Sequence, residues 1–155
     1  MRDDIRDSWH SPANRRQLSK LIDILRNLHH TRSDLEFINI SGDIHLSNAF
    51  VFQPDGFNKP LFQVTSSALT NNPPSEEGIL NLLSVDGPLN ANASSELFGK
   101  IQRLWHEGST QNFLTINADT QAIELHLHTY PSNGATPRVN DKILTIRPNQ
   151  GYALS

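Results

Sequence analysis

The segment FINISGDIHLSNAF, residues 37–50, decides the fold that we expect for this chain. Its first four residues belong to an apolar run over residues 35–40, and this run predicts a mostly buried strand. The run ends at Gly42, Asp43 and His45. A buried strand that runs into potential ligands is typical of α/β sheets, where ligands bind at the carboxyl ends of the strands. The same pattern also fits an ordinary turn after a strand.

A helix is predicted before this strand, over residues 12–30. Ser11 suits the N-cap and Pro12 the first helical position. His29 and His30 come near its end, where we expect solvated cations that favour the helix dipole. One apolar stripe follows from spacings of three and four: Leu18, Leu21, Ile22, Leu25 and Leu28.

Two strands are predicted after residue 47, at residues 48–53 and 60–65, joined by a turn that contains Pro, Asp and Gly. Residues 75–85 and 94–106 then predict short helices, the second from apolar residues at helical spacing.

The last third of the chain changes to alternating residues. Residues 112–130 predict a β-hairpin, and residues 142–148 a last strand. The elements together predict one α/β domain over residues 1–155 with an antiparallel C-terminal part.

Composition excludes several classes of protein. The net charge is −3 with dispersed Lys and Arg, which gives no nucleic-acid footprint. No apolar run could span a membrane, and the polar N-terminus is not a secretory signal, so we expect a cytoplasmic protein. The chain has no Cys, so a metal site must use His, Asp, Asn or Glu, which favours Ca, Mn, Fe or Zn.

Two groups of residues could bind such an ion. Asp43 and His45 offer a carboxylate and an imidazole. His126 and His128 lie on one face of a predicted strand, which would suit a cupin-like metal site, although an exposed strand face is the commoner explanation. The predicted helix over residues 12–30 argues against a cupin.

The segments DSWHSPANRRQL, INISGDIHLSNAF and LFQVTSSALTNNPP occur in this order, with the predicted helix between the first two. This ordered set resembles the C-terminal half of PhoD-like (alkaline phosphatase D-like) metallophosphatases, of the calcineurin-like metallophosphoesterase superfamily. The resemblance covers residues 1–75 and is looser over residues 111–148. It implies part of a metallophosphoesterase-like α/β sandwich with a mixed sheet and antiparallel C-terminal hairpins.

The resemblance also implies an activity and a set of site residues. Asp43 and His45 would be ligands of a dinuclear metal centre that hydrolyses phosphoesters. Asp7 and Trp9 match a family segment near the active site, and Arg15 matches an Arg that could bind phosphate or simply be solvated. Ser66 would be a structural hydroxyl beside the site.

The family's earlier metal-binding motifs, such as Asp-x-His and Gly-Asn-His-Asp/Glu, do not occur before residue 42. We therefore expect a C-terminal portion that is inactive alone. Its expected partners are a phosphoester substrate and the N-terminal half or a second copy. The alternative is a non-catalytic remnant that acts as a binding or interaction module.

Overall fold

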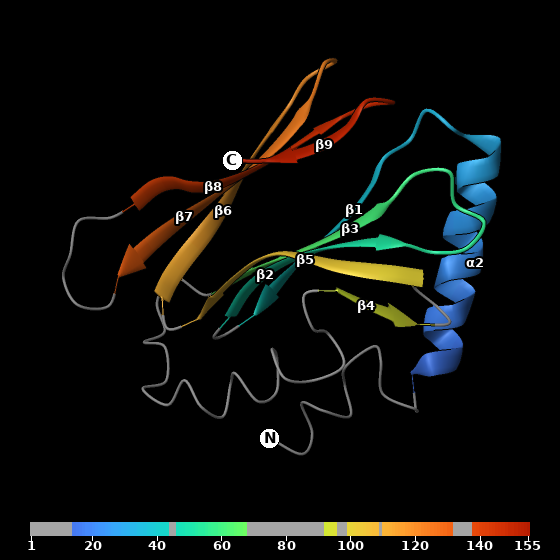
Figure 1. Cartoon of the computed structure of the whole chain (residues 1–155), viewed down its shortest axis with the longest axis horizontal. Helices are drawn as coiled ribbons and strands as arrows, with labels where there is room; N and C mark the ends of the chain where they lie inside the picture. Colours follow the sequence, from blue (N-terminus) through green and yellow to red (C-terminus); the bar gives the residue numbers. More distant parts are fainter. Residues whose placement is uncertain (1–13, 44–45, 68–91, 96–98, 109, 132–137) are drawn as a thin grey trace.

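One helix and nine strands are formed by the described part of the chain in a computed structural model (Figure 1). The structure describes residues 14–43, 46–67, 92–95, 99–108, 110–131 and 138–155. The helix is α2 (Arg15–Thr31). Sheet A contains β1 (Phe37–Asp43), β2 (Leu46–Gln53), β3 (Leu61–Ser67), β4 (Asn92–Ser95) and β5 (Gly99–Gly108). Sheet B contains β6 (Thr110–Ala118), β7 (Ile123–Pro131), β8 (Arg138–Arg147) and β9 (Gly151–Leu154).

The two sheets differ in strand direction. Sheet A has the order β1-β3-β2-β5-β4 and is mixed, because β1 runs parallel to β3 while its other pairs are antiparallel. Sheet B has the order β6-β7-β8-β9 and is antiparallel. The predicted mixed sheet and antiparallel C-terminal strands are confirmed. The balance is mostly β rather than evenly α/β, because the described residues form a single helix.

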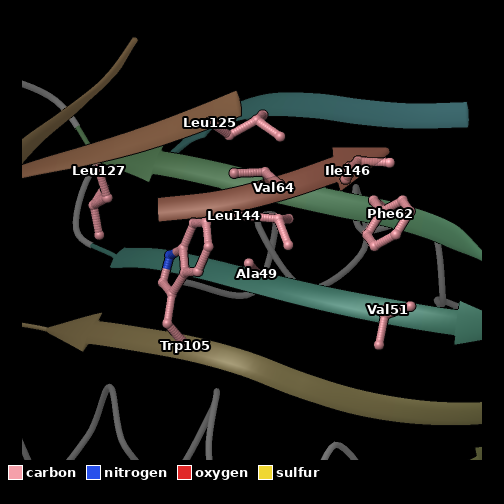
Figure 2. Close-up of a cluster of buried hydrophobic side chains, with 9 residues drawn as sticks. All are labelled: Ala49, Val51, Phe62, Val64, Trp105, Leu125, Leu127, Leu144 and Ile146. Carbon is pink, nitrogen blue, oxygen red and sulfur yellow. The ribbon is translucent and has the colours of Figure 1, made fainter. Parts of the chain in front are cut away.

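The main core fills the space between the sheets (Figure 2). Alternate residues of each strand point into it, as strand geometry requires. Sheet B contributes side chains that are almost wholly buried, and Trp105 is only 3% exposed. The core residues are Ala49, Val51, Phe62, Val64, Trp105, Leu125, Leu127, Leu144 and Ile146.

Helix α2 packs on sheet A through a second cluster, in which Leu18 and Ile22 meet Phe57 and Leu61. The neighbours of Leu61 in β3 belong to the core between the sheets, so strand alternation puts the helix on the opposite face of sheet A. The predicted stripe is therefore confirmed at Leu18, Ile22 and Leu25, whereas Leu21 and Leu28 are 38% and 41% exposed. The described helix begins at Arg15 with Asn14 as N-cap, and the predicted Ser11 and Pro12 lie outside the described residues.

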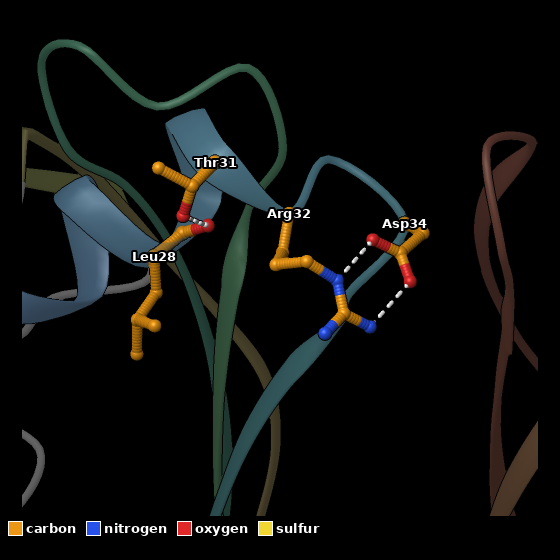
Figure 3. A network of polar contacts seen from close by, with 4 residues as sticks. All are labelled: Leu28, Thr31, Arg32 and Asp34. Carbon is orange, nitrogen blue, oxygen red and sulfur yellow. Dashed lines mark hydrogen bonds and ion pairs between the residues drawn. The ribbon is translucent and has the colours of Figure 1, made fainter.

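The helix ends in a set of local polar contacts (Figure 3). The hydroxyl of Thr31 donates to the carbonyl of Leu28 at 3.1 Å. Arg32 donates through Nε and Nη2 to the two oxygens of Asp34, at 2.9 and 2.8 Å. These bonds from Arg32 hold the pKa of the Asp34 carboxyl at about 2. The forked pair fixes the connection that leads into β1.

One residue of the helix end was predicted wrongly. His29 is 1% exposed, between the rings of Phe57 at 5.7 Å and Phe37 at 6.2 Å, rather than solvated. It follows Ile22 and Leu25 by seven and four residues and so extends the buried stripe. His30 is exposed, as predicted.

The predicted helix over residues 94–106 is also wrong, because residues 94–95 belong to β4 and residues 99–106 to β5. Ile101 pairs with Phe52, but the register shifts before Trp105 pairs with Ala49, which leaves Leu104 as the extra residue of a β-bulge. The bulge turns Trp105 to the opposite face from Ile101. Ile101 and Trp105 are both buried and lie four residues apart, and this spacing led to the wrong prediction of a helix.

Strand β1 is less buried than predicted. Among the described strands it is an edge of sheet A, paired with β3 alone. Asn39 and Ile40 are exposed, the latter at 47%. The apolar run at residues 37–40 serves two packing faces, since Phe37 meets the helix cluster and Ile38 the core between the sheets.

The chain also continues beyond the strand predicted to be its last. A turn over residues 147–151 leads from β8 into β9, with Asn149 at φ 61° and Gly151 at φ 95°. Asn and Gly are the residues that adopt such left-handed angles most easily.

No helix in the described ranges is long and apolar enough to cross a membrane.

Candidate functional site

The parallel pairing of β1 and β3 brings their carboxyl ends together. Gly42 lies opposite Ser66 and Asp43 opposite Ser67 in the register. Asp43 therefore lies next to the end of the Thr-Ser-Ser stretch. His45, Asp7 and Trp9 fall outside the described residues.

A row of polar side chains crosses sheet A two residues before the last residues of β1 and β3. Ser41 pairs with Thr65, Thr65 with Asn48, and Asn48 with His106, so the row spans β1, β3, β2 and β5. The hydroxyls of Ser41 and Thr65 lie 3.0 Å apart and share a hydrogen bond. Gln63 donates from Nε2 to the Ser41 hydroxyl at 3.0 Å. The row thus has a fixed pattern of donors and acceptors.

His106 closes the row with a defined tautomer. Its Nδ1 lies 2.6 Å from the amide oxygen of Asn48, and since that oxygen accepts, Nδ1 carries the proton. Burial lowers the pKa of His106, and the positive charge of Arg103 lowers it further. The imidazole is therefore neutral at pH 7 and keeps a lone pair on Nε2, which suits a metal ligand or a general base.

Arg103 adds an unsatisfied donor near His106. Its Nη1 is buried and has no hydrogen-bond partner among the described residues. A buried guanidinium nitrogen without an acceptor is unfavourable, and an anion bound beside it would remove that cost. Strand β5 thus carries a neutral imidazole at His106 and a buried, unsatisfied donor at Arg103, and these two groups suit a phosphoryl group.

Sequence reasoning missed both His106 and Arg103 as site residues, because residues 94–106 were predicted as a helix. The signal that could have found them is the polar alternation after Gly99, where Lys100, Gln102 and Arg103 interrupt the apolar residues more often than a core helix allows.

The other predicted residues lie as follows. Arg15 is the exposed first residue of α2. Ser66 is half-buried and, by strand alternation, lies on the face of sheet A that carries Val64 and meets sheet B. It is thus on the opposite face from the polar row. It shares the carboxyl end of the sheet with Asp43 but not the face of His106.

His126 and His128 do not lie on an exposed face. The side chain of His126 is 13% exposed and His128 is 7% exposed. Nε2 of His126 is 3.1 Å from a carboxylate oxygen of Glu124, whereas Nε2 of His128 is 2.8 Å from the Thr115 hydroxyl, and its ring stacks on Phe113 at 4.5 Å. Among the described residues, their strand belongs to a four-stranded sheet that does not close into a cupin-like barrel.

A complete metal site is not assembled by the described residues, which contain no group of three or more His, Cys, Asp or Glu suited to one ion. No protein-family model, curated protein or solved structure matches the chain.

Proposed function

We propose that this chain supplies part of the active site of a metal-dependent phosphoester hydrolase of the PhoD-like type. Asp43 and His45 would be two metal ligands. The observation that carries the proposal is the parallel register of β1 and β3, which sets Asp43 at the carboxyl end of the sheet beside the polar row that ends in His106.

The donor set fits divalent ions. A carboxylate and an imidazole suit Mn, Fe or Zn, and a carboxylate surrounded by hydroxyl and amide oxygens suits Ca. A catalytic ion usually takes about three protein ligands, and this set gives two. We propose that residues outside this sequence provide the remainder, reaching the site along the edge of β1 that pairs with no described strand, where Ile40 offers apolar surface.

Bound ions would supply an attacking hydroxide and would stabilise charge on the phosphoryl oxygens. The chain's own residues then have separate tasks. Arg103 offers its Nη1 donors to an anionic oxygen of the substrate. Asn48 holds His106 in the tautomer whose Nε2 can accept a proton. Ser41 and Thr65 bond to each other across β1 and β3 and keep the two carboxyl ends in register.

Paramagnetic Mn²⁺ tests the proposal, because it broadens NMR signals even at weak sites. Titrated into the labelled chain, it should broaden the amide signals of Gly42, Asp43 and Ser67 first. Replacing Asp43→Asn and His45→Ala together should remove this effect. Asp34→Asn is the matched control, since it removes an exposed carboxylate elsewhere and should leave the broadening unchanged.

Two results would overturn the proposal. Broadening that survives the double replacement would show that other residues bind the ion. Broadening centred on His126 and His128 would place the ion on sheet B. If Mn²⁺ broadens no signal selectively, the non-catalytic binding or interaction module becomes the better description.

A further inference from the structure

A cavity lies at the amino ends of β1 and β3, away from the site described above. It has a volume of about 400 Å³. Three connections surround it: the segment before β1, the turn before β3, and the turn between β8 and β9 (upper right of Figure 1). This volume lies within the range of small-ligand sites.

The cavity wall combines an apolar surface with charges. Pro60, Phe62 and Ile146 line it. Lys59 and Glu36 also line it, but they form an ion pair at 2.7 Å whose side chains are 16% and 7% exposed, so their charges cancel.

Arg147 supplies a further charge. It is exposed at the end of β8 and lines the cavity, and its guanidinium makes no hydrogen bond or ion pair with another residue of the described ranges. Since Lys59 and Glu36 cancel, the charged residues of the wall sum to one positive charge. Guanidinium groups bind carboxylates through two parallel hydrogen bonds.

His29 supplies an unmatched donor in the same wall. Asn58 donates its main-chain N–H to Nδ1 of His29 at 3.4 Å, so the imidazole proton resides on Nε2. That Nε2–H is buried and has no acceptor within the described part of the chain. Buried donors are almost always satisfied in folded proteins, so this one indicates a missing acceptor.

We propose that this cavity binds a small organic anion, whose carboxylate is held by Arg147 and the Nε2–H of His29 and whose apolar body rests on Pro60 and Phe62. Each part of such a ligand meets an otherwise unsatisfied part of the wall. A neutral ligand would leave Arg147 unpaired, and a bare inorganic anion would leave the apolar wall wet. This assignment is independent of the proposed phosphoesterase site.

Benzoate is a suitable probe, and the experiment is an NMR titration of the labelled full chain in the presence of a metal chelator. Saturable shifts are expected for the amides of Asn58, Lys59 and Gly151, with those of Gly42 and Asp43 unmoved. Benzyl alcohol has the same ring without the charge, and inorganic phosphate has the charge without the ring. Both should bind at least about tenfold more weakly, because each loses one half of the recognition.

Variants assign the binding to its residues. Arg147→Gln should weaken benzoate binding by at least about tenfold, because a charge-assisted pair is lost. Lys100→Gln, which removes an exposed cation from β5, should leave it unchanged. His29→Phe keeps a ring at this position and should also weaken binding.

The proposal is overturned if benzoate causes no saturable shifts, if benzyl alcohol or phosphate binds equally well, or if Arg147→Gln binds like the unaltered chain. The chelator makes these outcomes independent of Asp43 and His45. Failure here therefore says nothing against the metal site, and failure of the Mn²⁺ titration says nothing against the cavity.

Discussion

Replacing Leu144 by alanine tests whether the two sheets share one core. The side chain is 0% exposed and lies among the core residues contributed by sheets A and B. The change removes three carbon atoms, and at ~0.8 kcal/mol for each buried carbon the transfer loss is about 2.4 kcal/mol. The cavity left in a packed core adds about 1 kcal/mol, so unfolding should become easier by about 3–4 kcal/mol. For a domain of this size the melting temperature should fall by roughly 10 °C.

Leu154 provides the matched control. It pairs directly with Leu144 across β8 and β9, but it is 45% exposed. The same replacement there removes about half as much buried surface and opens no closed cavity, so it should cost about 1 kcal/mol. Urea unfolding followed by the fluorescence of Trp105, which is 3% exposed, measures both variants. Equal losses in the two variants would refute the shared core.

Three further predictions concern single positions. The carboxyl of Asp34 should titrate by NMR near pH 2 rather than at its ordinary pKa of 3.8, and Arg32→Gln should raise that midpoint; an unchanged midpoint in the variant would contradict the pairing. Because the folded pKa is lowered, the stabilisation from this pair is present above pH 4 and is lost as the pH falls toward 2. Gly99→Ala should destabilise the fold by more than about 2 kcal/mol in urea unfolding, because φ is +61° and the new Cβ would collide with a main-chain carbonyl of β2. Gly42→Ala is the control and should cost far less, because there is open space around Gly42. Burial and then the charge of Lys59 lower the folded pKa of His29 from 6.5, so the unfolded chain takes up the proton first and the free energy of unfolding should fall as the pH drops below about 6.5. His29→Gln should remove this pH dependence of stability between pH 7 and pH 5. A variant with the same pH dependence would assign it to another group.

Local patterns predicted the hairpins well. Strict alternation in residues 123–127 fixed β7 and its pairing with β6, because period-two burial has no helical counterpart. The turn between β2 and β3 was equally readable, since Gly56 there has φ 80°.

The errors share one cause, which is that tertiary partners decide what a short apolar run becomes. The bulge at Leu104 gave β5 a helical spacing. The edge position of β1 left Ile40 exposed. The burial of His29 depends on Phe57, which reaches it from a distant turn, and no local pattern shows that contact.

The candidate site was predictable only in part. The neighbourhood of Asp43 and Ser66 followed from the rule that parallel strands present their carboxyl ends together. The contribution of His106 was not predictable, because it depends on a long-range pairing with Asn48.

The strand order also has a kinetic consequence. Strands β2 and β3 are close in sequence and form an antiparallel pair, whereas β1 pairs with β3 and must bypass its own successor in the chain. Closing a local hairpin costs less chain entropy than a crossover, so β1 should dock after the hairpin has formed. Within the described part of sheet A, β1 has one neighbouring strand whereas β2 and β3 have two each, so β1 should open before them and exchange its amide hydrogens faster than they do. The position of Asp43 next to Ser67 is then completed after the β2–β3 hairpin in folding and lost before it in unfolding.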